Sequence, residues 1–114
     1  MAPPSFKERA ALIGVYRYQA ETASITVNGM ALLSDRDSQS LLTSAALEAV
    51  IDPAYRCQWK IPSGFVDLDA QQIITLARAM RAHVQACFDR EAELLDHLEK
   101  GTFTEDMLDQ GWPA

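Results

Sequence analysis

The fold is decided by the stretch DAQQIITLARAMRAHVQACFDREAELLDHLEKG, which runs from Asp69 to Gly101. Asp69, with Gln72 three positions later, is typical of a helix N-cap, and Gly101 is typical of the residue that follows a helix. The residues between them include no Gly or Pro. The sequence therefore predicts one helix about 46 Å long, from a rise of ~1.5 Å per residue. We expect part of such a helix to project from a small core or to pair with another chain.

Apolar residues recur along this helix at alternating steps of four and three, which is a heptad ladder interrupted by Glu91. Two interpretations of this apolar surface are open. If it is a wide stripe, the helix is expected to pack within its own chain. If the narrower heptad ladder is what counts, the helix at 70–100 is expected to form a homo-oligomer. For the second interpretation, the expected contact residues are Leu94, Leu95 and Leu98. The ladder consists of Ile73, Ala77, Met80, Val84, Cys87, Glu91, Leu94 and Leu98.

Residues 55–61, just before the helix, alternate between apolar and polar side chains, the period of a strand with one buried and one wet face. Pro62-Ser63-Gly64 predicts a turn, and residues 65–68 return as the partner strand. Trp59 falls on the apolar face, which favours a core position over a patch that binds glycans or nucleic acid. The wet face is a candidate partner surface, formed by Arg56, Gln58 and Lys60.

Residues 24–33 predict another hairpin, because Asn28-Gly29 supplies the two positive φ angles that a type I′ turn requires. The register that this turn imposes places four large apolar side chains on one face. They are Ile25 opposite Leu32 and Val27 opposite Met30.

Two more helices and a short helical turn complete the predicted elements. Ser5 and Glu8 resemble a capping box that opens a helix over residues 5–22. A second helix follows the capping residues 34–37 and ends before Asp52-Pro53, and Thr102–Glu105 repeats the capping-box pattern ahead of the short turn. The apolar stripe of the second helix is Leu41, Leu42, Ala45, Ala46, Ala49 and Val50.

These elements predict an α+β fold in which two β-hairpins, with four short antiparallel strands, pack with helices. The predicted order is α-ββ-α-ββ-long α-short α. A chain of 114 residues has the length of one ordinary domain with one core. We therefore expect residues 1–16 to be a lead-in with the start of the first helix, and residues 17–114 to be a single domain.

The charge balance excludes several classes of partner. Ten Lys and Arg residues against sixteen Asp and Glu residues give a net charge of -6, which disfavours nucleic-acid binding and membrane surfaces. No apolar run approaches the roughly 20 residues that a bilayer requires, and the amino terminus lacks a signal-peptide pattern. Two cysteines give no disulfide framework, so we expect synthesis in a reducing cytoplasm.

His83 and Cys87 share one helix face at i, i+4, a spacing that suits zinc or a thiol–imidazole pair. His97 lies about 21 Å from His83 along the helix axis, so it cannot complete a site with His83. The apolar neighbours of Cys87 are expected to raise the pKa of its thiol, which makes the thiol less reactive. A core cysteine is favoured, and the sequence predicts no metal, no cofactor and no catalytic residue. The acidic residues Asp89–Glu99 are interpreted as a solvated face, with Arg90 and Lys100 as local partners.

Several blocks of sequence in order resemble an uncharacterised domain family of tailed bacteriophages and prophages, from about Arg17 to Trp112. That family often forms the carboxy-terminal part of tail or tail fibre assembly proteins. The blocks are Glu21–Met30, Asp35–Gln39, Leu42–Ala46, Gln58–Lys60, Gly64–Asp69 and Arg81–Arg90.

The resemblance implies a phage tail-associated protein without catalytic activity, whose partner is a tail-fibre or other tail protein. It acts either as an assembly factor (chaperone) in the host cytoplasm or as a structural subunit that stays in the virion tail tip, baseplate or fibre. The least favoured hypothesis is that the protein is an enzyme that uses the thiol of Cys87.

Overall fold

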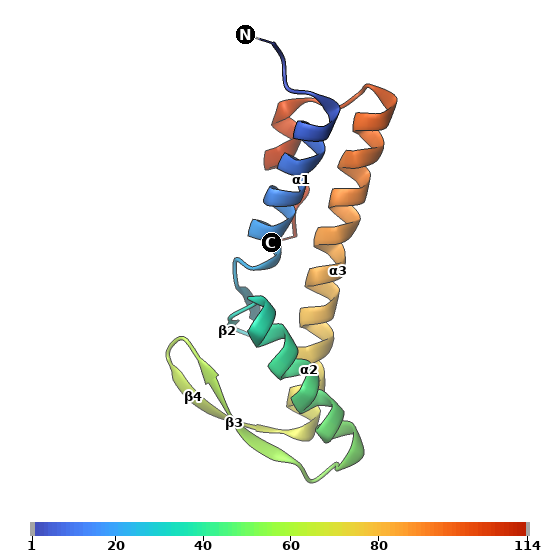
Figure 1. Cartoon of the computed structure of the whole chain (residues 1–114). Coiled ribbons are helices and arrows are strands. Elements are labelled where there is room, and N and C mark those ends of the chain that lie inside the picture. Colours follow the sequence, from blue (N-terminus) through green and yellow to red (C-terminus); the bar gives the residue numbers. More distant parts are fainter. Residues whose placement is uncertain (1, 114) are drawn as a thin grey trace. The chain divides into compact units, whose positions relative to one another are not determined.

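The computed structural model describes residues 2–113 and has the predicted α+β fold and element order (Figure 1). The last element is a 3₁₀ turn where the sequence predicted a short helix. No helix within residues 2–113 combines the length and the apolar character needed to cross a bilayer. The elements are α1 (Phe6–Glu21), β1 (Ile25–Val27), β2 (Met30–Leu32), α2 (Arg36–Ile51), β3 (Arg56–Ile61), β4 (Gly64–Asp69), α3 (Ala70–Lys100) and the 3₁₀ turn η1 (Glu105–Asp109).

The chain divides into two compact units. One, the continuous unit, consists of residues 22–83. The other, the terminal unit, combines residues 1–21 with residues 84–114. Each unit has its own cluster of buried apolar side chains, whereas the chain length predicted one core.

Both predicted hairpins are present in the continuous unit, and the first has the predicted register. Ile25 pairs with Leu32 and Val27 with Met30, and the turn between them has φ angles of 52° at Asn28 and 79° at Gly29. Both angles lie in the left-handed region that a type I′ turn uses. In the second hairpin each residue of β3 pairs with one of β4, from Arg56 with Asp69 to Ile61 with Gly64.

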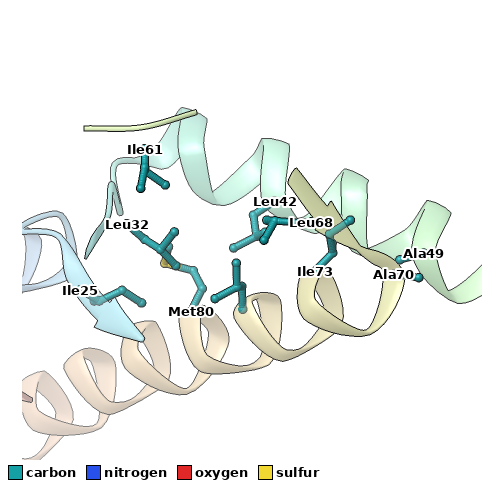
Figure 2. Close-up of a cluster of buried hydrophobic side chains, with 10 residues drawn as sticks. Ile25, Leu32, Leu42, Ala49, Ile61, Leu68, Ala70, Ile73 and Met80 are labelled. Atoms are coloured by element: carbon teal, nitrogen blue, oxygen red, sulfur yellow. The ribbon is translucent and has the colours of Figure 1, made fainter. Parts of the chain in front are cut away.

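The core of the continuous unit lies between the hairpins, α2 and the first turns of α3. Figure 2 shows Leu42, Leu68 and Ile73 meeting between α2 and the start of α3. The apolar stripe expected on α2 is partly wrong, because Leu41 and Val50 are 63% and 66% exposed. Leu42, Ala45, Ala46 and Ala49 are the members of that stripe that pack in the core.

The helix α3 begins and ends where its sequence predicts. The backbone N–H of Asp69 donates to Oε1 of Gln72 over 2.9 Å, and the N–H of Gln72 donates to Oδ1 of Asp69 over 2.8 Å. At the other end Gly101 has a φ of 73°, and the N–H of Thr102 donates to the carbonyl of His97 over 2.9 Å. The two reciprocal bonds at the start of α3 and the backbone bond at its end satisfy backbone groups that would otherwise lack partners.

In the terminal unit α1 lies beside the second half of α3 (Figure 1). Ser5 and Glu8 form the predicted capping box, since the N–H of Glu8 donates to Oγ of Ser5 over 3.1 Å. The capping box expected at residues 102–105 is wrong, because η1 begins only at Glu105 with Thr104 as its N-cap, and the Thr102 hydroxyl donates to the carbonyl of His97 instead, over 3.3 Å. The core of this unit is formed by Ile13, Leu94, Leu98 and Leu108.

Candidate functional site

An apolar groove of about 750 Å³ lies between α2 and β3 in the continuous unit. Most of its surface comes from exposed or half-buried apolar side chains, and Glu48 and Lys60 are its charged residues. The lining residues are Leu33, Ser38, Leu41, Ser44, Ala45, Glu48, Tyr55, Cys57, Gln58, Trp59, Lys60, Ile61, Pro62 and Phe65.

The wall formed by α2 follows from helical spacing. Leu41, Ala45 and Glu48 are separated by four and three residues and therefore lie on one face. Leu42 and Ala49 lie on the neighbouring face and are buried in the core. The helix thus carries more apolar surface than its core contact covers, and this surplus forms the groove.

The wall formed by β3 follows from the alternation of the strand. Tyr55, Cys57 and Trp59 share the face that packs on the core and are half-buried, so part of their surface remains open to the groove. Trp59 lies on the apolar face of β3, as predicted, but it is only half-buried. Gln58 and Lys60 point to the opposite face and still line the groove, which indicates that the groove reaches the edge of β3.

The residues predicted as a polar partner surface lie on the exposed face of β3. Arg56, Gln58 and Lys60 are all exposed. Nη2 of Arg56 lies 2.6 Å from Oδ2 of Asp67 on β4, and this contact raises the pKa of the guanidinium. Gln58 and Lys60 line the groove. Arg56 is not among the lining residues and forms a surface ion pair with Asp67.

The leucines predicted as an oligomer contact on α3 lie in the core of the terminal unit or against it. Leu94 is fully buried and Leu98 is 9% exposed, both within the terminal unit against Ile13 and Leu108. Leu95 is half-buried and packs against the same cluster. Here α1 and the carboxy-terminal turn cover the last part of the apolar ladder, so Leu94 and Leu98 are core residues and Leu95 packs against them.

The two cysteines have protonated thiols at neutral pH. Burial raises the pKa of Cys57, and the negative charge of Asp67 raises it further. Burial likewise raises the pKa of the fully buried Cys87, with a smaller contribution from Glu21. The direction for Cys87 agrees with the prediction from its apolar neighbours. A protonated thiol is a poor nucleophile and a poor metal ligand.

Metal-ligating residues do not gather in the part of the chain that the structure describes. No group of three His, Cys, Asp or Glu side chains within residues 2–113 is arranged to hold a metal ion. His83 is half-buried on the same helix as Cys87. Among the acidic residues of α3, Asp96 pairs with Lys100 and Glu93 with Arg90, as the solvated-face interpretation expects. The interpretation is wrong for Glu91, which is half-buried and pairs with Arg17.

Sequence reasoning missed a buried ion-pair cluster in the terminal unit. Glu21 is fully buried, and its Oε1 accepts a hydrogen bond from Nη1 of Arg17 over 2.6 Å. Nε of Arg17 donates to Oε1 of Glu91 over 3.1 Å, and its guanidinium lies 4.4 Å from the ring centroid of Phe88. The i, i+4 spacing of Arg17 and Glu21 is visible in the sequence, but the long-range partner is not.

The groove between α2 and β3 offers a concave, mostly apolar surface for binding. The groove combines apolar walls, a protonated thiol and the edge of a strand. Concave apolar surfaces with a few polar groups are the usual form of ligand-binding sites in proteins.

Comparison with known proteins gives one relationship. No curated protein and no solved structure matches the chain. One family model covers nearly all of it, beginning at residue 6, eleven residues before the start of the resemblance noted from the sequence. The chain therefore belongs to the family described as "Domain of unknown function (DUF4376)", whose model matches residues 6–110.

Proposed function

We propose that this chain is a non-catalytic protein-binding domain of bacteriophage tail morphogenesis. In this proposal it acts in the host cytoplasm as an assembly factor for a tail-fibre or receptor-binding protein. The observation that carries the binding role is the apolar groove between α2 and β3. The sequence blocks that resemble phage tail proteins supply the biological setting.

The physical support for a protein partner is the amount of apolar surface outside both cores. Leu33, Leu41 and Phe65 line the groove and are 49%, 63% and 65% exposed. Large apolar side chains that gather around a concavity favour association, because burial of apolar surface is worth about 25 cal/mol per Å². A partner that covers them gains this free energy.

A structural subunit retained in the virion tail is the alternative, because a permanent contact uses the same kind of surface. Mass spectrometry of purified particles separates the two roles. A chaperone is absent from the particle and abundant in the producing cell, and it co-purifies there with a tail protein. A structural subunit is present at a stoichiometric copy number.

The binding role is tested by a matched pair of substitutions on α2. Leu41→Asp places a charge in the groove, and Leu47→Asp places one at a residue outside the groove lining, on the same helix. The two leucines are 63% and 64% exposed, so neither substitution disturbs a core. We expect Leu41→Asp to weaken capture of the tail protein about tenfold or more, and Leu47→Asp to leave it unchanged. Equal capture by both variants contradicts a binding role for the groove.

A further inference from the structure

We propose that the groove takes an extended segment of the partner, which adds as a third strand to the free edge of β3. The segment alternates apolar with acidic side chains. This inference rests on the protein-binding role proposed above and specifies the chemistry of the partner. It is carried by the register of the β3–β4 hairpin, the lining of the groove and the charges on the exposed face of β3.

The backbone of β3 supplies the first part of the argument. Pro62 and Ser63 form a two-residue turn between paired residues Ile61 and Gly64. The pair that flanks such a turn is hydrogen-bonded, and hydrogen-bonded pairs alternate with non-hydrogen-bonded pairs from there. Gln58 and Lys60 therefore fall in non-hydrogen-bonded pairs, as does Arg56.

In such pairs the backbone N–H and C=O of each residue point away from the partner strand. Within residues 2–113, β3 has β4 as its one neighbouring strand. The N–H and C=O groups of Arg56, Gln58 and Lys60 thus lie along a free edge. Unpaired edges of this kind bind extended peptides through the backbone.

The groove supplies the second part. Because the groove reaches the β3 edge, an added strand directs every second side chain toward its apolar walls. Those side chains would meet Leu41 of α2 and the open parts of Tyr55 and Trp59. Apolar side chains at alternate positions of the partner segment match this surface.

The exposed face supplies the third part. An added strand places its other side chains beside Arg56 and Lys60, the two cations of the β3 edge. Opposite charges on neighbouring strands stabilise a sheet, and like charges destabilise it. The intramolecular neighbour β4 follows the same rule, since its Asp67 pairs with Arg56. Acidic residues at the outward positions of the partner segment are therefore favoured.

A second copy of the chain fits this edge poorly. Two β3 strands that pair antiparallel around Gln58 place Arg56 of each copy opposite Lys60 of the other, which brings like charges together. The β4 edge carries the acidic residues, but Leu68 on its inner face is 2% exposed and already serves its own core. Val66, the other apolar residue of that face, packs against the same core and is half-buried, so the inner face of β4 has little apolar surface to offer to the groove of another copy.

The proposal is tested with synthetic peptides and amide-resolved NMR on the full chain. The first peptide alternates Glu and Val, and the matched control replaces every Glu by Lys. We expect millimolar Glu/Val peptide to shift the amide signals of Gln58 and Lys60 and to slow their hydrogen exchange. The Lys/Val peptide should bind about tenfold more weakly or not at all.

Two substitutions assign the contact. Gln58→Pro removes an N–H at the free edge without removing a bond to β4, and Asp67→Pro is the matched change at the opposite edge. We expect the first, and not the second, to abolish peptide binding. Should proline disturb the hairpin, Lys60→Glu provides an independent measurement, because it should reverse the preference between the two peptides.

Several results overturn the proposal. These are binding that survives Gln58→Pro in a folded protein, signal changes confined to residues away from β3, or no binding of the Glu/Val peptide. A dimer joined through β3 in light scattering also overturns it.

The proposed function fails separately. Tail-protein capture that is sensitive to Leu41→Asp but insensitive to Lys60→Glu refutes the strand-addition mode alone, and peptide binding without any tail-protein capture refutes the phage role alone.

Discussion

Nε of Arg17 on α1 lies 3.1 Å from Oε1 of Glu91 on α3, and the same guanidinium contacts the fully buried Glu21. One cation therefore serves two carboxylates in the interior of the terminal unit. Removal of this shared cation is costly, because buried carboxylates have lost most of their hydration.

Replacement of Arg17 by Ala is expected to lower the free energy of unfolding by about 3 kcal/mol or more. The variant keeps Glu21 in the interior and removes the cation 2.6 Å away. Lys100→Ala is the control, since it removes an exposed ion pair with Asp96 and should change stability far less. Urea denaturation measures both. Equal effects from the two variants would show that the Arg17 cluster contributes no more than a surface pair.

The turn at Asn28-Gly29 is expected to tolerate Gly at residue 28 but not a β-branched residue at 29. Gly29 has a φ of 79°, which Val adopts only with strain, so Gly29→Val should cost about 1 kcal/mol or more. No heavy atom lies near the position of an added Cβ, so the cost comes from the backbone and not from a clash. Thermal melting of Gly29→Val and Asn28→Gly tests the difference.

Replacement of Leu94 by Ala is expected to cost about 2–5 kcal/mol, the range for a leucine deleted from a core. Leu94 is fully buried against Ile13 and Leu108, so the loss should fall on the terminal unit. Hydrogen exchange should show faster opening of α1 while amides of the β3–β4 hairpin keep their protection. A variant as stable as wild type would contradict the core assignment.

The thiol of Cys87 is expected to make stability dependent on pH only under alkaline conditions. Its pKa in the folded chain is raised above the ordinary value of 9.0, so its protonated form stabilises the fold fully below pH 9.0. That contribution is lost as pH rises through the raised pKa. The stability difference between wild type and Cys87→Ala should therefore shrink above pH 9.0, as measured by urea denaturation at several pH values. Alkylation of the native thiols at neutral pH should be slow.

Locally encoded features could be predicted from the sequence, and contacts between distant segments could not. The Asn28-Gly29 turn fixed its own register, and Asp69, Gln72 and Gly101 marked the ends of α3 through bonds spanning a few residues. The periodicity around Leu94 indicated a buried seam but not what covers it. That cover is α1, which is about 80 residues away in sequence.

The groove was missed for a related reason. Apolar residues on α2 occupy more than one face, and the sequence does not tell which face meets the core. Leu41 and Leu42 are neighbours of equal hydrophobicity, yet one is 63% exposed and the other 1%. The excess width of apolar residues on this helix was the available signal. The candidate residues of β3 were accessible to sequence analysis because a strand alternates strictly between two faces.

The division of the terminal unit into two distant segments sets the order in which a growing chain can fold. Residues 22–83 form a unit that is continuous in sequence, so it has all its parts as soon as those residues have left the ribosome. Helix α1 is made before α2 and α3, but Ile13 finds its core partners only after residues 84–108 emerge. At about 5–20 residues per second, α1 waits several seconds with its apolar face uncovered. During synthesis, the helix most in need of protection from aggregation is therefore α1, which is made before α2 and α3 but stays uncovered until the end of α3 has emerged.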